Sequence, residues 1–308
     1  MSASSINWVS NDEMFALVDM GRAVRAIQRD LAAGLDPAQD FARSILDLEH
    51  GQLLYMPSRF GDFVGAKVST VAPKNPAMGR DRIQGVYLLM DALTLEPIML
   101  MDGQALTALR TPAVSAAIAD HLAPTIVDHL VVFGSGAQAW GHLEAMRSIR
   151  DVGRVSIVAR DQGRSATLVE RIVSSGQEAR VGDASDVRDA QVIICATTSR
   201  TPLFDGTMVL DDALAVAVGS HEPDVRELDS SLVSRAQVVV EDPGAALREA
   251  GDLLIPISEG RFSQSAMVAM RDIITGDVAV DHTRPRVFKS SGMPWQDLVV
   301  AVEIYRAR

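Results

Sequence analysis

The chain has 308 residues, of which 47% are hydrophobic and 22% charged, and its formal net charge is −11. This length and composition predict a large core and about two domains. The acidic balance argues against a nucleic-acid partner, because such proteins need a basic surface to displace counterions. We also expect no membrane span, since Asp91, Glu96 and Pro97 interrupt the longest apolar run.

Cysteine and lysine usage narrow the class further. Cys195 is the only cysteine, and the first residues lack the basic and apolar segments of a secretion signal, so we predict a cytoplasmic protein. The six histidines lack metal-ligand spacing, and we predict no metal site. Only Lys67, Lys74 and Lys289 among the 29 basic residues are lysines. A GC-rich genome accounts for this bias, yet it makes each lysine worth inspecting.

The N-terminal part and the end of the chain are predicted to form one domain. Ser10 and Glu13 have the spacing of a capping box, and apolar residues at helical spacing follow them. Residues 42–103 contain short apolar runs separated by turn residues, which indicates a mostly antiparallel sheet. An alanine-rich helix is expected over 106–122, and an amphipathic helix within 290–308 is expected to pack on this domain.

The middle of the chain has a different pattern. From Asp128 onward, continuous apolar runs alternate with helical stretches, as in a doubly wound parallel sheet, and the alternation ends after Gly276. We therefore predict an α/β protein. A Rossmann-type domain covers residues 119–284, and residues 1–118 with 285–308 form an α+β domain.

A glycine-rich turn follows the first of these apolar runs. Gly134, Gly136 and Ala139 have G-x-G-x-x-A spacing between a predicted strand and a predicted helix. The first glycine permits a tight turn, the second lets the backbone approach a pyrophosphate, and the small third residue allows close packing. The turn predicts a dinucleotide site that includes Ser135, Ala137 and Gln138.

The end of the second run bears on the choice between NAD and NADP. NAD sites commonly place an acidic residue there, whereas this strand ends in Arg160 followed by Asp161. Arg160, with Arg164 nearby, suits a 2′-phosphate, so NADP(H) is favoured. The alternative is that Arg160 is a solvated cation and Asp161 binds the ribose of NAD(H).

Two later apolar runs are followed by small and polar residues that could contact the cofactor at the same edge of the sheet as the glycine turn. In open α/β sheets nucleotides bind at the carboxyl ends of strands, which places two short segments near the cofactor. For the threonines a turn or capping role is the alternative to a cofactor contact. The residues predicted here are Ala196, Thr197, Thr198, Val218 and Gly219.

These motifs together resemble the ornithine cyclodeaminase and mu-crystallin family, which includes cyclic ketimine reductases and some alanine dehydrogenases. The similarity covers nearly the whole chain, and its elements are specific in combination. The matching stretches are Gly65–Val68, Met101–Gly103, Leu106–Thr111, Gly134–Ala139, Ala196–Thr198, Val218–Ser220, Arg226–Asp229 and Ser291–Gly292.

The resemblance implies a division of roles between the two domains. The first domain binds substrate and forms homodimers through its sheet. Arg43, Lys67 and Arg110 match the family's cluster for the substrate carboxylate, where a guanidinium grips the carboxylate and Lys67 supplies a charge or a proton. Arg110 and Thr111 also lie near the cofactor in the family. Ser291 belongs to the last matching stretch and is a further predicted cofactor contact.

His221 departs from the cyclodeaminases of this family, which have an aspartate at the corresponding position. Cyclodeamination must hold a cationic amine, so the loss of this carboxylate argues against it. A histidine titrates near neutral pH and can donate a proton to an imine under reduction. The alternative is that His221 only caps a loop. The acidic stretch 222–229 is expected to be a solvated helix start.

The function favoured is NAD(P)H-dependent reduction of a cyclic ketimine, Δ1-pyrroline-2-carboxylate or Δ1-piperideine-2-carboxylate, to the amino acid. Hydride passes to the imine carbon, and Lys67 or His221 stabilises or protonates the imine nitrogen. Ornithine cyclodeaminase, with tightly bound NAD, is the alternative. Alanine dehydrogenase and a non-catalytic ligand binder like mu-crystallin are lesser ones.

Overall fold

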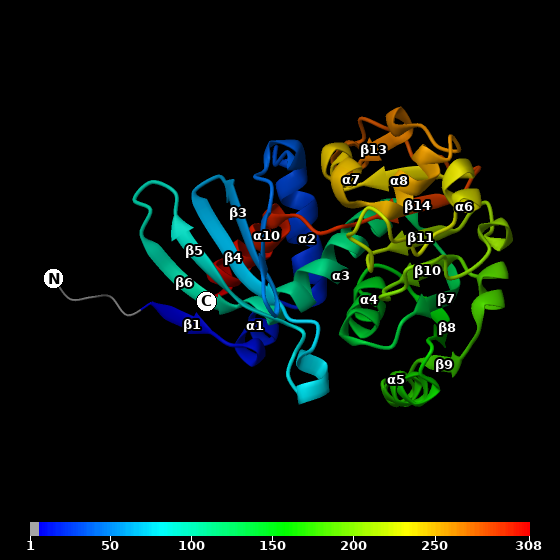
Figure 1. Ribbon diagram of the computed structural model, residues 1–308, viewed down its shortest axis with the longest axis horizontal. Coiled ribbons are helices and arrows are strands. Elements are labelled where there is room, and N and C mark those ends of the chain that lie inside the picture. The colour runs from blue at the N-terminus through cyan, green and yellow to red at the C-terminus, as the bar shows by residue number, and fades with distance from the viewer. Residues whose placement is uncertain (1–5) are drawn as a thin grey trace. The chain divides into compact units, whose positions relative to one another are not determined.

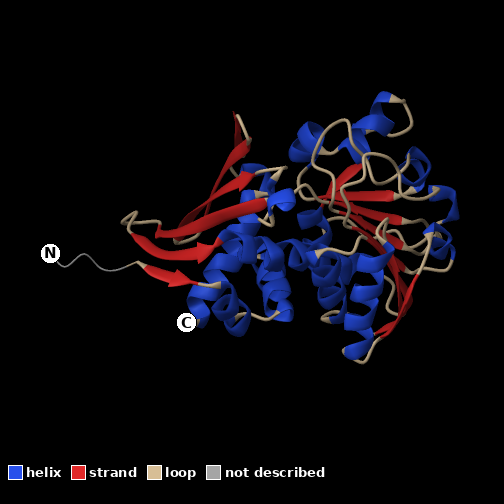
Figure 2. Ribbon diagram, turned by 60° about the horizontal axis from the view of Figure 1, so that its bottom comes forward, coloured by secondary structure: helices blue, strands red, loops and turns tan. Residues whose placement is uncertain are grey.

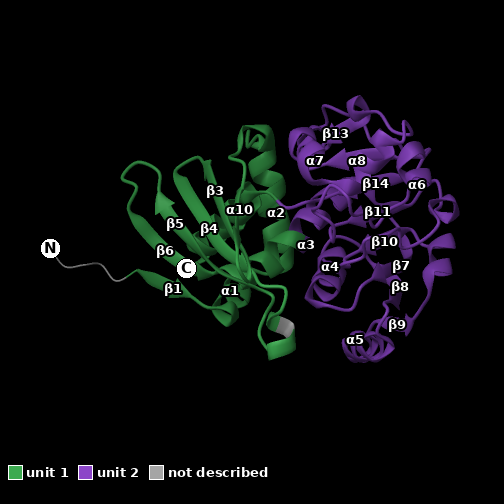
Figure 3. Ribbon diagram, in the orientation of Figure 1, with its two compact units in different colours: residues 1–111, 293–308 green, residues 112–292 purple. Residues whose placement is uncertain are grey.

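The chain forms two compact units, which Figure 3 colours separately. The computed structural model describes residues 6–308, so the first five residues, part of the segment in which we expect no secretion signal, lie outside the described residues. Unit 1 comprises the chain up to Thr111 together with Met293–Arg308, and unit 2 is Pro112–Gly292. Relative to the predicted boundaries, residues 112–118 and 285–292 thus belong to unit 2.

Unit 1 is built on a six-stranded sheet in the order β1-β6-β5-β4-β3-β2 (Figure 1). Strands β2 to β6 pair antiparallel in chain order, as predicted, and β1 joins the β6 edge in parallel. The strands are β1 (Asn7–Val9), β2 (Ser44–Leu48), β3 (Gly51–Phe60), β4 (Phe63–Val71), β5 (Ile83–Asp91) and β6 (Pro97–Asp102).

Helices cover one face of this sheet (Figure 2). The predicted capping box is confirmed, because Ser10 accepts from the Glu13 N–H while the Glu13 side chain accepts from the Ser10 N–H. The predicted alanine-rich helix begins earlier than expected, directly after β6. The helical segments are α1 (Asn11–Leu17), α2 (Met20–Ala32), the short 3-10 turns Pro37–Gln39 and Asn75–Met78, α3 (Gly103–Leu122), which runs on into unit 2, and α10 (Pro294–Ala307).

The C-terminal helix α10 packs on β3, β4 and β5 and against α2, as the sequence predicts for its apolar residues. It is not amphipathic, however, because Gln296, Asp297 and Glu303 are buried along with the apolar side chains. Glu303 is accommodated by ion pairs to Arg22 at 2.6 Å and Arg29 at 3.0 Å. Burial on more than one side brings polar groups of α10 into the interior of unit 1.

Unit 2 is an eight-stranded, fully parallel sheet in the order β13-β12-β14-β11-β10-β7-β8-β9 (Figure 1). The chain moves outward from β7 through β8 and β9 and then returns to β10 on the other side of β7. This confirms the predicted doubly wound sheet. The strands are β7 (Val127–Phe133), β8 (Val152–Val158), β9 (Glu178–Val181), β10 (Val192–Cys195), β11 (Leu214–Ala217), β12 (Gln237–Val240), β13 (Met267–Ala269) and β14 (Arg286–Lys289).

The expectation that the pattern ends after Gly276 is wrong, because β14 lies between β11 and β12 in the middle of the sheet. Its sequence RVFK hides the strand, since two of its four residues are basic. Both are nevertheless buried. Arg286 donates to the carbonyl oxygens of Leu122 and Asp212, and Lys289 pairs with Asp252.

The remaining helices of unit 2 connect the strands, and Cys195, at the end of β10, is buried in the core. Among the described residues no helix is long and apolar enough to cross a membrane. The helical segments are α4 (Ala137–Arg147), α5 (Gln162–Ser174), α6 (Ser230–Arg235), α7 (Pro243–Glu249), α8 (Gly251–Ser258) and α9 (Met270–Thr275), with 3-10 turns at Ala184–Arg188, Gly206–Met208 and Gln264–Ala266.

Candidate functional site

Unit 1 buries two of its predicted substrate-binding cations around one carboxylate. Lys67 in β4 is 3% exposed and Arg110 in α3 is 6% exposed, so neither is a surface cation. Lys67 Nζ lies 2.8 Å from Asp297 Oδ2 and donates to Oδ1 at 2.9 Å. Arg110 Nε lies 3.3 Å from the same Oδ1. Helix α10 thus supplies the counter-ion for both cations.

Neutral acceptors complete the shell around the two cations. Arg110 donates to Gln296 Oε1 at 2.6 Å, and Lys67 Nζ donates to Thr107 Oγ1 at 3.2 Å. Two cations facing one buried carboxylate leave a net positive charge, which favours an anionic ligand. Asp297 and Gln296 were not predicted. Both directly precede the apolar run Leu298–Val302, but nothing in the sequence around them indicates their partners.

The electrostatic surroundings of Lys67 also include Arg43. Burial lowers the pKa of the Lys67 ammonium to about 8. Asp297 opposes this shift, while the positive charges of Arg110 and Arg43 add to it. The three cations predicted for substrate binding are therefore close enough to influence one another within unit 1. A lysine with such a pKa can release its proton near neutral pH.

Two further polar groups that the sequence did not indicate lie in the same region. The carboxylate of Asp40 accepts from the Trp295 N–H at 2.7 Å, and burial raises the pKa of Asp40 to about 6. The Tyr87 hydroxyl is buried and has no hydrogen-bond partner within the described residues. Burial raises the pKa of Tyr87 well above its usual value, and the charges of Asp297 and Asp40 add to the shift. An unsatisfied buried hydroxyl calls for a water or ligand partner.

Unit 2 presents the predicted glycine turn at the carboxyl end of β7. Gly134 has φ +120°, and a Cβ there would lie 2.5 Å from the Ala196 carbonyl oxygen. The Gly134 N–H donates to the Val158 carbonyl oxygen at 2.8 Å, while Ala196 N–H donates to Phe133. The ends of β7, β8 and β10 therefore meet at this turn. It is the point where the strand order reverses, at which nucleotides bind in such sheets.

Helix α4 begins directly after this turn. Gly136 is its N-cap and supplies no side-chain hydrogen bond, so the first N–H groups of the helix are available to a ligand. No atom lies within 4 Å of the position that a Cβ on Gly136 would occupy. These features fit a dinucleotide pyrophosphate, which an uncapped helix N-terminus binds through backbone N–H groups and its dipole.

The end of β8 places Arg160 on the surface, followed by Asp161. Asp161 is the N-cap of α5, and its carboxylate accepts from the Arg164 N–H at 3.0 Å. The Arg164 Nε also lies 3.6 Å from Asp161. Asp161 is thus engaged within its own helix, whereas the Arg160 side chain extends from the edge that carries the glycine turn.

The other predicted cofactor residues follow the ends of three neighbouring strands. Ala196, Thr197 and Thr198 follow β10, and Val218 and Gly219 follow β11. Ser291 follows β14, and its N–H donates to Glu241 Oε2 at 3.0 Å. His221 is exposed on the segment after β11, and Thr111 is half-buried in α3 at the end of unit 1. Within unit 2 the predicted residues therefore share one edge of the sheet.

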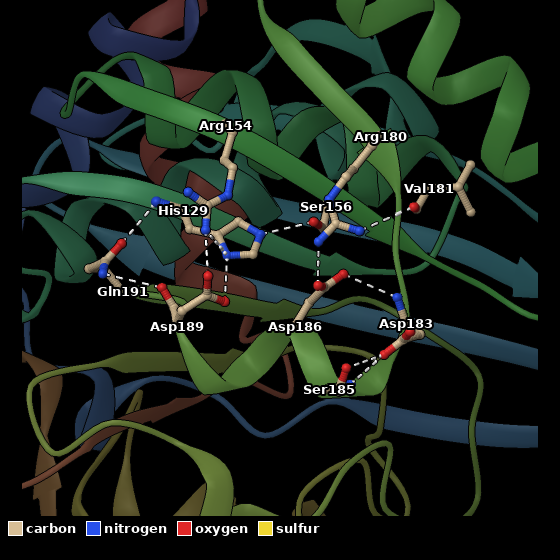
Figure 4. A network of polar contacts seen from close by, with 10 residues as sticks. All are labelled: His129, Arg154, Ser156, Arg180, Val181, Asp183, Ser185, Asp186, Asp189 and Gln191. Carbon is tan, nitrogen blue, oxygen red and sulfur yellow. Dashed lines mark hydrogen bonds and ion pairs between the residues drawn. The ribbon is translucent and has the colours of Figure 1, made fainter.

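A second polar network in unit 2 superficially resembles a nucleophilic triad (Figure 4). His129 Nδ1 lies 3.0 Å from Asp189, and His129 Nε2 lies 2.9 Å from Ser156 Oγ. His129 and Ser156 are both fully buried, so no substrate can reach the hydroxyl. The network is structural. Across residues 6–308 no group of His, Cys, Asp and Glu side chains is placed to hold a metal ion.

The parallel sheet, the reversal of strand order and the open glycine turn define a Rossmann-type dinucleotide-binding protein with an added mixed-sheet unit. The family model of the ornithine cyclodeaminase/mu-crystallin family matches residues 9–307. The chain belongs to this family.

Known relatives agree with this assignment. The chain is 35% identical over 267 residues to a Delta(1)-pyrroline-2-carboxylate reductase of Bacillus cereus, covering 83% of this chain and 82% of the relative. A structure of Thermococcus litoralis Delta(1)-pyrroline-2-carboxylate reductase, in complex with NADH and L-proline, is similar with a TM-score of 0.91 and 26% identity, covering 98% of this chain and 97% of that one. An archaeal alanine dehydrogenase dimer with bound NAD has a TM-score of 0.92 and 25% identity, covering 98% and 95%.

The space around Gly136 yields a test of the dinucleotide site. Serine is a good N-cap and nothing crowds the position, so Gly136→Ser should leave the free energy of unfolding unchanged. A side chain there would obstruct a pyrophosphate, so the Kd for NADH, measured by fluorescence titration, should rise about tenfold or more. Gly163→Ser, in the first turn of α5, is the matched control. Equal NADH affinity in the two variants would contradict a pyrophosphate at Gly136.

Proposed function

We propose that this protein is an NAD(P)H-dependent reductase that converts a cyclic ketimine carboxylate, Δ1-pyrroline-2-carboxylate or Δ1-piperideine-2-carboxylate, to the L-amino acid. The observation that carries the proposal is the buried pair of cations Lys67 and Arg110 around Asp297. A net positive, desolvated cluster fits a small carboxylate substrate. The Bacillus cereus relative, named for reduction of one of these imines, supports the same substrate class.

Arg110 and Arg43 hold the substrate carboxylate in this proposal. Arg110 is fixed by Gln296 and Asp297, so its guanidinium is oriented before substrate arrives. Preorganised cations bind a carboxylate without losing further side-chain entropy. Gripping the carboxylate fixes the adjacent imine carbon in one orientation, as hydride transfer requires.

Lys67 donates the proton to the imine nitrogen. A bound dihydronicotinamide supplies the hydride for the imine carbon, so the C=N bond becomes a C–N single bond and the nitrogen gains one proton. The ammonium of Lys67 is protonated at neutral pH and has a pKa of about 8, close to the working range of a general acid. Asp297 and Thr107 orient its remaining hydrogens. His221 is the alternative donor, and it stands where a cyclodeaminase has an aspartate.

Replacing Lys67 tests this assignment. With Δ1-pyrroline-2-carboxylate and NADPH, kcat/KM of the wild type should fall as pH rises through about 8, because Lys67 loses its proton. Lys67→Gln should lower kcat/KM by about 10²–10⁴-fold and abolish this alkaline limb. His221→Asn is measured alongside. If the limb is lost in His221→Asn and kept in Lys67→Gln, the proton comes from His221.

We further propose that NADP(H) is the preferred cofactor. Asp161 is occupied as the N-cap of α5, which weakens the alternative that it binds a ribose hydroxyl. Arg160 is exposed at the end of β8, and a guanidinium there suits a 2′-phosphate.

Arg160→Ala therefore discriminates between the two cofactors. Loss of a charge-assisted contact to the phosphate should raise the KM for NADPH about tenfold while that for NADH changes little. The measurement is initial-rate kinetics with each cofactor at saturating imine. Equal changes for the two cofactors would remove the basis for the NADPH preference.

We also propose a homodimer formed through the open face of the unit 1 sheet. This face carries apolar side chains that are more than a third exposed, which is unusual for a monomer. The archaeal alanine dehydrogenase of similar fold is a dimer. The exposed apolar residues of this face are Leu46, Leu48, Tyr55, Val68 and Val86.

A charge on this face should break the dimer. Leu46 is 56% exposed in the edge strand β2, and Leu46→Glu would bury a carboxylate in the proposed interface. Light scattering should give twice the 33.1 kDa chain mass for the wild type and the single chain mass for Leu46→Glu. Leu247→Glu on α7, also an exposed leucine, is the control. A monomeric wild type would refute the interface.

A further inference from the structure

Unit 2 contains a buried ionic cluster of three residues from separate segments of the chain. Lys289 is the last residue of β14, Asp252 lies in α8, and Glu227 follows β11; each is at most 2% exposed. Lys289 Nζ lies 2.9 Å from Asp252 Oδ2 and also donates to the Ser220 carbonyl oxygen. The cluster corrects the expectation that the stretch 222–229 is a solvated helix start. The cluster also gives Lys289, one of the three lysines of the chain, a buried ion-pair partner.

The Glu227 carboxylate joins two loops of the cofactor edge. Its Oε1 accepts from the Thr197 N–H at 2.8 Å and from Thr197 Oγ1 at 2.7 Å, while Oε2 accepts from the Gly219 N–H at 2.8 Å. Thr197 lies two residues beyond β10, and Gly219 lies two residues beyond β11. The approach is so close that a Cβ on Gly219 would lie 2.5 Å from Glu227 Oε1. One carboxylate therefore sets the separation of these two loops.

Asp252 fixes the segment that carries Glu227. Its Oδ1 accepts from the Glu227 N–H at 2.6 Å and from the Leu228 N–H at 2.8 Å, while its other oxygen faces Lys289. Two carboxylates and one ammonium leave a net negative charge in a buried place, which is costly. Apolar side chains would pack here at a lower cost in desolvation free energy. A buried group of charges that the fold does not need therefore indicates a function.

We propose that Glu227 is a positioning residue whose ionised carboxylate holds the loops after β10 and β11 in the arrangement that binds the dinucleotide. This inference rests on the cofactor site proposed above. Asp252 and Lys289 act through Glu227, the first by orienting its backbone and the second by compensating its charge.

The protonation of Glu227 makes the inference measurable. Burial raises the pKa of Glu227 to about 7; Lys289 opposes the shift and Asp252 adds to it. Cys195 faces the same cluster, and its pKa is raised well above the usual value by burial, so it stays neutral. Below pH 7 Glu227 gains a proton and loses acceptor strength toward Thr197 and Gly219. Affinity for the cofactor should therefore fall as pH decreases from 8 to 6.

The experiment is a fluorescence titration of the full-length protein with NADH at pH 8, 7 and 6. The wild-type Kd should rise several-fold between pH 8 and 6. Glu227→Gln should bind about tenfold more weakly at pH 8 and show no pH dependence, because its amide offers one acceptor and cannot titrate. The exposed side chain of His221, next in sequence to Ser220, is the other candidate source of a pH dependence. A pH dependence retained in Glu227→Gln would assign it to His221 and overturn the inference.

Two further variants complete the test. Asp189→Asn removes an acid of unit 2 that pairs with His129 and Arg154 toward the amino ends of β7 and β8 (Figure 4), so its NADH affinity and pH dependence should match the wild type. Glu227→Asp keeps the charge, but its side chain is one methylene shorter, so its bonds to the two loops are weakened and not abolished. It should bind NADH weakly with the pH dependence intact, which covers the case in which Glu227→Gln fails to fold. A wild type with constant affinity from pH 6 to 8 refutes the inference, whereas a wild type that binds neither NADH nor NADPH refutes the proposed function.

Discussion

The carboxylate of Asp297 is the interaction on which unit 1 depends. It joins strand β4, through Lys67, to helix α3, through Arg110, and it does so from the last helix of the chain. Removing one partner of such a buried pair costs about 3–5 kcal/mol, because it leaves an uncompensated charge away from water. The C-terminal helix is therefore held by charge as well as by packing. In the proposed function the same interaction orients two cations for the substrate carboxylate.

We propose that both units bind anionic ligands, but through different groups. In the proposed function, unit 1 offers side-chain charge to a small anionic substrate, whereas unit 2 offers the cofactor backbone N–H groups at an uncapped helix and at the ends of parallel strands. In each unit a buried lysine pairs with a buried aspartate, Lys67 with Asp297 and Lys289 with Asp252. Each pair lies beside residues predicted to contact a ligand. Other charges are buried as well, such as Arg286 and Glu303, but their partners hold elements of the fold together away from the predicted site residues.

Much of this arrangement could be predicted from local sequence. Alternating apolar runs indicated the parallel sheet, the glycine spacing indicated the turn after β7, and the scarcity of lysine drew attention to Lys67. Strand β14 was not predicted, because the basic residues Arg286 and Lys289 are typical of a protein surface and their buried partners are distant in the sequence. The roles of Asp297 and Glu227 were not predicted for the same reason. Their partners lie far away in the sequence, and no local pattern indicates an ion pair between distant segments.

In the proposed function the cations around Asp297 serve a reduction and not a cyclodeamination. The most direct measurement follows product stoichiometry with the purified protein: proline formed against NADPH consumed from Δ1-pyrroline-2-carboxylate, with ammonia released from ornithine and NAD measured in parallel. We predict one NADPH consumed for each proline and no ammonia from ornithine. Ammonia and proline from ornithine, with no net change in the cofactor, would contradict the proposed reduction and identify a lyase.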